Sequence, residues 1–215
     1  MIRAVLFDLD GTLADTAPDL GDALNRLLAE EGRPALAAGI YRPYVSQGSR
    51  GLLGIGFGLG PGDDAYAALQ KRFLAYYEAR LCEGTRLFEG MAELIEALER
   101  KDIAWGVVTN KPARFTLPLM ERLGLRGRAA SIVSGDSTVR PKPAPDPLLL
   151  ACAEAGVPPT ATLFVGDDLR DIQAGKAART GTVAAAYGYL SGETPLDDWG
   201  ADARIDHPLE LLSLL

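Results

Sequence analysis

The chain has 215 residues, of which 47% are hydrophobic and 24% charged, a composition typical of a globular protein with a buried core. Its formal net charge is −7, without a long basic run, which argues against nucleic acid or an anionic membrane as a partner. The two cysteines, Cys82 and Cys152, lie far apart and indicate neither a disulfide framework nor a zinc site. We see no secretory signal pattern and no membrane-length apolar run, and therefore expect a cytoplasmic protein.

The first predicted element is a strand over Ala4–Phe7, an uninterrupted apolar run that indicates burial on both faces of a sheet. It leads into Asp8-Leu9-Asp10-Gly11-Thr12. Because side chains alternate along a strand, Asp8 and Asp10 are expected to point the same way, at the edge where open α/β sheets bind ligands. A divalent cation would relieve the repulsion between two such carboxylates. Taken alone, this pattern is equally typical of a solvated turn.

Residues 15–83 are predicted to be mostly helical and to form an insert after the first strand. A first helix is expected to start with Asp15 or Thr16 as its N-cap, followed by an apolar stripe at helical spacing. A glycine-rich stretch over residues 40–59 is less regular and matches neither a dinucleotide-binding fingerprint nor a P-loop. A second long helix is predicted from Asp63 to about Leu81.

From residue 84 onward, predicted helices and strands alternate, which implies a doubly wound parallel sheet with helices on both faces. We therefore predict an α/β core formed by residues 1–14 and 84–215, with the helical cap at residues 15–83 between its two parts. The expected helices are 91–100, 115–123, 147–155, 172–178 and 209–214, and the expected strands are 103–108, 130–133, 162–165, 183–186 and 203–206.

Two of the later segments carry groups that can bind phosphate. Thr109-Asn110-Lys111 follows a predicted strand and offers a hydroxyl, an amide and backbone N–H groups, although a helix N-cap explains it equally well. Lys142 lies between Pro141 and Pro143, which restrict its backbone and would position its charge in advance. A stiff surface loop with a solvated lysine is the commoner meaning of that pattern.

A third segment, Gly166-Asp167-Asp168-Leu169-Arg170-Asp171, ends another apolar strand with acidic residues. An acidic N-cap of the following helix explains part of this acidity. It does not explain why two separate strands both end in paired aspartates. Several carboxylates at one sheet edge suit Mg²⁺, and the single histidine, His207, argues against zinc.

Taken together and in this order, these segments resemble the four motifs of the haloacid dehalogenase superfamily, and the early helical insert is similar to a C1-type cap. The likeness spans the whole chain and is strongest to the phosphoglycolate phosphatase group. Two stretches, Trp105–Pro112 and Leu163–Ile172, also resemble a branch that acts on N-acetylmuramic acid 6-phosphate.

The resemblance implies a Mg²⁺-dependent hydrolase of a small phosphorylated metabolite, such as 2-phosphoglycolate, that forms an aspartyl-phosphate. Alternatives are a sugar phosphate such as N-acetylmuramic acid 6-phosphate, a phosphomutase, or a non-enzymatic receiver-type phospho-acceptor domain. A dehalogenase would need only the first aspartate. The implied roles are Asp8 as nucleophile and Asp10 as general acid and base; Asp8, the Asp10 backbone carbonyl and Asp167 as metal ligands; Asp168 and Asp171 in the outer shell; and Thr109, Asn110 and Lys142 on the phosphoryl oxygens. In the cap, Arg50 is expected to meet a substrate carboxylate, although a surface arginine is the more frequent finding.

Overall fold

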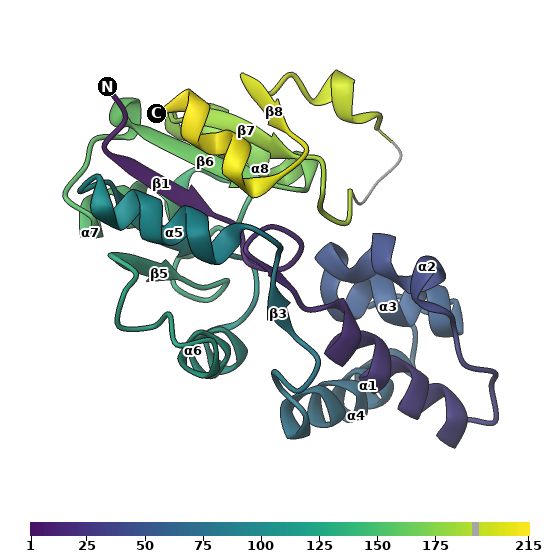
Figure 1. The fold of residues 1–215 in the computed structure, drawn as a ribbon. Coiled ribbons are helices and arrows are strands. Elements are labelled where there is room, and N and C mark those ends of the chain that lie inside the picture. Colours follow the sequence, from purple (N-terminus) through teal and green to yellow (C-terminus); the bar gives the residue numbers. More distant parts are fainter. Residues whose placement is uncertain (191–193) are drawn as a thin grey trace.

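The computed structural model describes residues 1–190 and 194–215. At its centre is a six-stranded sheet of order β5-β4-β1-β6-β7-β8, in which every neighbouring pair is parallel (Figure 1). The predicted doubly wound parallel sheet is thus confirmed. The strands are β1 (Ala4–Phe7), β4 (Ala104–Val108), β5 (Ser131–Val133), β6 (Thr162–Gly166), β7 (Gly181–Ala185) and β8 (Ala203–Ile205).

Helices cover both faces of this sheet, and β1 runs through its middle. Val5 and Phe7 pack on one face, in a core that α5 and α6 also line. Leu6 points to the other face, in a core formed with α7 and α8. Burial on both faces explains why all four residues of β1 are apolar. The helices are α5 (Met91–Arg100), α6 (Ala113–Arg122), α7 (Asp146–Glu154) and α8 (Leu169–Ala178), and the 3₁₀ helices are η2 (Pro159–Ala161), η3 (Leu196–Trp199) and η4 (Pro208–Leu214).

A group of helices, called the helical insert below, lies beside the sheet (Figure 1). It enters through β2 (Ala14–Asp15) and leaves through β3 (Arg86–Leu87), which pair as a short antiparallel ribbon. The predicted cap boundaries at residues 15 and 83 fall at or just before these two strands. The insert comprises α1 (Ala17–Glu30), α2 (Ala38–Tyr41), the 3₁₀ helix η1 (Arg42–Gln47), α3 (Gly48–Phe57) and α4 (Tyr66–Ala79).

The glycine-rich stretch 40–59 is more regular than its composition predicts, since it contains all of η1 and all of α3. Packing overrides the weak helix propensity of glycine here. Leu52 and Leu53 are fully buried, and a Cβ on Gly56 would lie only 2.9 Å from a methyl carbon of Leu24 on α1. Glycine therefore lets α3 approach α1 closely.

The start of α1 also differs from the prediction. Thr16 occupies the N-cap position, but its hydroxyl donates to Asp10 instead of capping the helix. Asp15, the other predicted N-cap, accepts from the Ala17 N–H at 3.3 Å. The core domain adds to this cap, because the Tyr189 hydroxyl accepts from the backbone N–H of Thr16 at 2.7 Å and of Ala17 at 2.9 Å. Tyr189 in turn donates to Asp15 at 2.8 Å. A side chain more than 170 residues away in the sequence thus caps the first helix of the insert.

Other predicted boundaries shift by up to three residues; α8, for example, begins at Leu169 and not at residue 172. The second long helix of the insert begins at Tyr66, because the Asp63 carboxylate accepts from the Gly60 N–H and closes a turn before it. The final helix predicted at residues 209–214 is the 3₁₀ helix η4.

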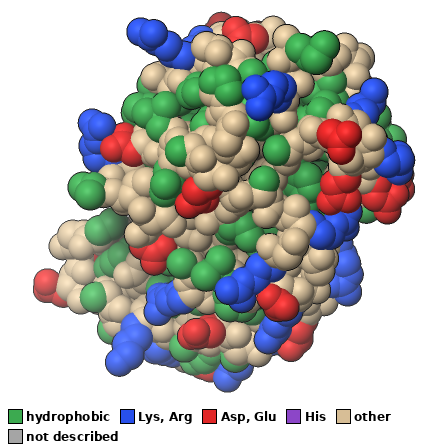
Figure 2. Space-filling model, turned by 90° about the vertical axis from the view of Figure 1, so that its left-hand side faces the viewer, with side chains coloured by type: hydrophobic (Ala, Val, Ile, Leu, Met, Phe, Trp, Pro, Cys, Tyr) green, Lys and Arg blue, Asp and Glu red, His purple; other side chains and the backbone are tan. Residues whose placement is uncertain are grey.

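Figure 2 shows one face of the molecule, on which scattered Lys, Arg, Asp and Glu side chains lie among apolar side chains and other groups. A mixed surface of this kind agrees with a protein that does not rely on a broad charged field to bind a polyanion. Among the described residues, no helix is both long enough and apolar enough to cross a membrane.

We predict that Asp19→Ala destabilises the protein by about 3 kcal/mol, because three hydrogen-bond donors would lose their acceptor. Asp19 is buried in α1 and accepts from the Gly84 N–H at 2.6 Å and from the Thr85 N–H and hydroxyl at 3.0 and 2.6 Å. It thereby ties α1 to the segment that leaves the insert. Urea unfolding measures the change. Asp22→Ala is the control, since Asp22 is exposed and pairs only loosely with Arg80; equal effects of the two substitutions would contradict the prediction.

Candidate active site

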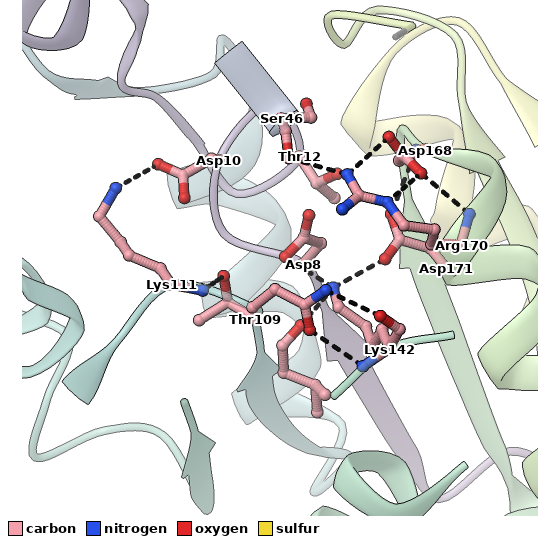
Figure 3. A network of polar contacts seen from close by, with 12 residues as sticks. Asp8, Asp10, Thr12, Ser46, Thr109, Lys111, Lys142, Asp168, Arg170 and Asp171 are labelled. Carbon is pink, nitrogen blue, oxygen red and sulfur yellow. Dashed lines mark hydrogen bonds and ion pairs between the residues drawn. The ribbon is translucent and has the colours of Figure 1, made fainter. Parts of the chain in front are cut away.

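The carboxyl ends of three adjacent strands bring the predicted site residues together. In the sheet register, Phe7 of β1 is level with Val107 of β4 and Val165 of β6. The residues that follow these strands therefore reach the same edge, as Figure 3 shows for Asp8 and Thr109. Parallel strands bind ligands at this edge in open α/β sheets.

A cluster of three buried carboxylates lies at this edge. Asp8, Asp167 and Asp171 each offer an oxygen, and these oxygens lie within 4.8 Å of one another. Burial, together with the charges of Asp8 and Asp171, raises the pKa of Asp167 well above its usual range. Burial raises the pKa of Asp171 to about 7; Lys142 opposes this rise and Asp8 adds to it. Crowded, buried carboxylate oxygens are the donor set that a hard divalent cation prefers, so these residues fit a metal ion.

Lys142 is buried inside this cluster and is not the solvated surface lysine that its flanking prolines alone more often indicate. Its ammonium contacts Asp8 Oδ1 at 2.8 Å and Asp171 Oδ1 at 2.7 Å, and donates to the Val108 carbonyl at 2.8 Å. Burial alone would lower the pKa of Lys142, but the two carboxylates outweigh it and raise the pKa instead. The ammonium therefore stays charged and close to the expected nucleophile.

Asn110 lines the cavity as predicted, but its side chain does something the sequence did not reveal. Its Oδ1 accepts from the Lys142 N–H at 3.0 Å, and its Nδ2 donates to the Lys142 carbonyl at 2.9 Å. The amide thus clamps the backbone of the lysine on both sides. The Asn110 side chain therefore holds the backbone of Lys142 in place, and its predicted contact with the phosphoryl oxygens stays a prediction.

Asp167 is held in place by several donors that sequence reasoning missed. The Thr12 hydroxyl donates to its Oδ1 at 2.9 Å, and the Tyr189 N–H donates to its Oδ2 at 2.9 Å. Gly11, with φ of +90°, lies so close that a Cβ there would sit 2.2 Å from Oδ2. The Gly-Thr pair that follows the first strand therefore shapes the site of a carboxylate more than 150 residues away.

Asp10 is in the cavity but outside the carboxylate cluster, and Figure 3 shows it turned toward Lys111. Its Oδ1 accepts from Lys111 Nζ at 2.8 Å and from the Thr16 hydroxyl at 2.5 Å. The Lys111 ammonium also lies over the ring of Tyr77 from α4, at 4.7 Å from the ring centre. Burial would lower the pKa of Lys111, but Asp10 and Tyr77 outweigh it and raise the pKa. Lys111 is thus a residue of the site whose partner, Asp10, lies 101 positions away in the sequence and could not be foreseen from the Thr109-Asn110-Lys111 pattern.

Asp168 and Asp171 form the N-terminal capping box of α8, which confirms the structural alternative for part of this acidity. The Asp168 side chain accepts from the Arg170 N–H at 2.9 Å, and Asp171 accepts from the Asp168 N–H at 3.1 Å. Asp171 also belongs to the carboxylate cluster, whereas Asp168 is absent from that group among the described residues. Their predicted outer-shell roles toward a metal stay predictions.

A cavity of about 310 Å³ extends from these residues to the helical insert. Its floor includes Asp8, Asp10 and Thr109, and its opposite wall includes residues 45–50 at the junction of η1 and α3. Arg50 lines this wall and is exposed. The predicted catalytic residues and the predicted insert contact therefore share one cavity, although the role of Arg50 stays a prediction.

A family model of haloacid dehalogenase-like hydrolases matches residues 2–179 of the chain. The chain belongs to this family. It is 46% identical over 214 residues to an N-acetylmuramic acid 6-phosphate phosphatase of Pseudomonas putida, a match that covers 100% of this chain and 96% of the relative. It is 42% identical over 211 residues to a phosphoglycolate phosphatase of Xanthomonas campestris, covering 97% and 94% of the two chains. The predicted family is thus confirmed, and the chain is a phosphatase of the haloacid dehalogenase type.

The fold agrees with the family assignment. A crystal structure from Haemophilus somnus, described as a predicted phosphoglycolate phosphatase, superposes with a TM-score of 0.87 at 28% identity. The match covers 99% of this chain and 97% of the other. The superposition therefore includes the helical insert as well as the sheet.

We predict that Mg²⁺ stabilises the protein more at about pH 8 than at about pH 5, because protons and the cation compete for the same carboxylates. The raised pKa of Asp171, about 7 against an ordinary 3.8, means that the folded protein binds more protons than the unfolded chain between these values. Without metal, stability from this group is therefore greatest below its ordinary pKa and falls as pH rises toward 7.

Thermal unfolding with EDTA and with excess Mg²⁺, at both pH values, measures this effect. Asp171→Asn should flatten the pH dependence of the metal-free protein. An equal rise in melting temperature with Mg²⁺ at both pH values would contradict the assignment of a cation to these carboxylates.

Proposed function

We propose that the protein hydrolyses the phosphate monoester of a sugar acid of the N-acetylmuramic acid 6-phosphate class, through an aspartyl-phosphate on Asp8. The size and lining of the cavity carry the choice of substrate. At about 310 Å³ it falls in the range of sites that enclose a whole small-molecule ligand, roughly 300–1,000 Å³. Phosphoglycolate, the first expectation from sequence, is a smaller molecule and has no ring face to place against the apolar part of the lining. The 46% identical relative named for the sugar acid phosphate supports the same choice.

The lining of the cavity suits a ligand with apolar faces and polar edges. Phe73, Leu74 and Phe115 offer apolar surface for a sugar ring face and an acetyl methyl group. Ser49 and Gln70 offer polar groups on the insert side, where Gln70 Nε2 donates to the Ser49 hydroxyl at 2.8 Å. Arg50 would donate a charge-assisted hydrogen bond to the substrate carboxylate.

The chemistry begins with Asp8, whose carboxylate attacks phosphorus and forms the acyl phosphate. This splits one difficult displacement into two easier ones. The approach of a carboxylate to a phosphate dianion is opposed by like charge, and Lys142, which contacts Asp8, offsets that repulsion. Asp8, Asp167 and the Asp10 carbonyl would hold Mg²⁺, which when bound neutralises charge on the phosphoryl oxygens. Thr109 and backbone N–H groups at the end of β4 orient those oxygens.

Asp10 completes the reaction as the proton carrier. It follows the nucleophile by two residues and lines the same cavity. Asp10 must carry a proton when the first step begins, and in that step it gives this proton to the leaving alcohol oxygen. In the second step it takes a proton from the water that attacks the aspartyl-phosphate. The two steps regenerate Asp8 and release inorganic phosphate.

The two alternatives to a hydrolase are a receiver-type phospho-acceptor domain and a phosphomutase. A receiver-type phospho-acceptor domain is excluded by the family of the chain and by its helical insert. A phosphomutase would share the residues around Asp8 and differ in transferring the phosphoryl group back to a second hydroxyl. The released product distinguishes it from a hydrolase.

We predict phosphate release from N-acetylmuramic acid 6-phosphate with a higher kcat/KM than from 2-phosphoglycolate or p-nitrophenyl phosphate, all assayed with Mg²⁺. Asp8→Asn should abolish release, and Asp10→Asn should lower kcat by roughly 10²–10⁴-fold. Undiminished release in Asp8→Asn would overturn the mechanism, and a preference for 2-phosphoglycolate would overturn the substrate. Movement of phosphate to another hydroxyl without release would identify a mutase.

We further predict that Arg50→Ala raises KM for N-acetylmuramic acid 6-phosphate by roughly 10–100-fold, the value of a charge-assisted hydrogen bond. KM for p-nitrophenyl phosphate, which carries no carboxylate, should change little. Arg26→Ala is the matched control, because Arg26 lies on α1 and pairs with Glu30 at the surface. An unchanged KM for the sugar acid phosphate would remove Arg50 from its recognition.

A further inference from the structure

Arg170 joins the core to the helical insert beside the catalytic cavity. It is the second residue of α8, and it lines the cavity together with Asp8. Its Nη2 donates to the backbone carbonyl of Ser46 in η1 at 2.8 Å, while the same guanidinium holds both oxygens of Asp168 (Figure 3). Neither the sequence analysis nor the proposed chemistry gives this arginine a role.

On the core side, the guanidinium is held in a fixed orientation. Its Nε and Nη2 donate to Asp168 Oδ1 and Oδ2 at 2.8 and 2.9 Å, a two-point contact that fixes the plane of the group. Asp168 is itself buried and caps α8, and its N–H donates to Asp171 of the carboxylate cluster. The position of the guanidinium is therefore set relative to the site where chemistry occurs.

On the insert side, the bond falls on the segment that forms the cavity wall. Ser46 carries a second bond to the core, from its hydroxyl to Asp167 Oδ2 at 3.2 Å. Two residues later, Gly48 has φ of +61°, which glycine adopts readily, and there the chain turns from η1 into α3. Arg50 follows in the first turn of α3. Ser46 is therefore held against the core two residues before α3 begins. Its position fixes the position of the first turn of α3, which forms the cavity wall opposite Asp8.

We propose that Arg170 is a positioning residue that fastens residues 46–50 of the helical insert to the Asp167–Asp171 segment, and thereby sets the cavity wall that selects the substrate. The proposal rests on the phosphatase function proposed above. An arginine is required because one planar group must bind a carboxylate at two points and reach a carbonyl at the same time. A lysine has a single ammonium on a flexible chain and cannot fix both partners in one geometry.

Hydrogen exchange of the full-length, substrate-free protein tests the fastening directly. In Arg170→Gln, residues 42–57 should exchange at least about tenfold faster than in the unaltered protein, a local opening that corresponds to about 1.4 kcal/mol. Arg170→Lys should give an intermediate rate. Arg204→Gln is the matched control, because Arg204 pairs with Asp206 in the C-terminal part of the chain, outside the residues that line the cavity.

Kinetics supply a second measurement that a merely structural role would not reproduce. Arg170→Gln should raise KM for N-acetylmuramic acid 6-phosphate several-fold more than KM for p-nitrophenyl phosphate, because only the larger substrate reaches the whole wall. Unchanged exchange at residues 42–57, or faster exchange spread evenly over the chain, would overturn the proposal. If the unaltered protein shows no activity on the sugar acid phosphate, the proposed substrate fails, while the exchange result still decides the role of Arg170.

Discussion

Three carboxylates and one ammonium are buried together at the end of the central strand, and the contacts around them offset the cost of burying their charges. Lys142 offsets Asp8 and Asp171, but Asp167 has only hydroxyl and N–H donors as partners among the described residues. A buried charge without a counter-ion is costly, and the raised pKa of Asp167 expresses that cost. The same excess of negative charge favours a bound cation, whose charge would in turn offset the repulsion between these carboxylates and a phosphoryl group.

The core and the helical insert share one hydrophobic cluster, and in the proposed mechanism the core supplies the reacting groups while the insert contacts the substrate. The sheet edge holds the groups that react, each fixed by its strand and by partners such as the Asn110 clamp on Lys142. The helical insert supplies the opposite wall. Three of the contacts between the core and the insert lie beside the cavity. The Tyr189 hydroxyl accepts from the first backbone N–H of α1, the Lys111 ammonium lies over the ring of Tyr77, and Arg170 donates to the Ser46 carbonyl. These contacts connect the insert wall of the cavity to the same segments that hold the carboxylate cluster, which is the basis of the positioning role proposed for Arg170.

Local patterns in the sequence predicted the elements whose cause is local. The apolar run of β1 and the helical periodicity of α5 were sufficient to place both, and the parallel sheet then brought Asp8, Asp167 and Lys142 to one edge. The sequence could not reveal contacts between distant segments, such as the Tyr189 cap or the bond from Arg170 to Ser46. Helix α3 escaped prediction for a related reason, since its glycines disfavour a helix until α1 packs against them.

Trapping the covalent intermediate tests the central claim most directly. The protein is mixed with a phosphate monoester substrate and Mg²⁺, quenched in acid within the first turnovers, digested and analysed by mass spectrometry. We predict a phosphoryl group on the peptide that contains Asp8, at that residue, and its loss on longer incubation. Full turnover without phosphorylation of Asp8, or with the phosphoryl group on a different residue, would contradict a mechanism built on the buried carboxylates and Lys142.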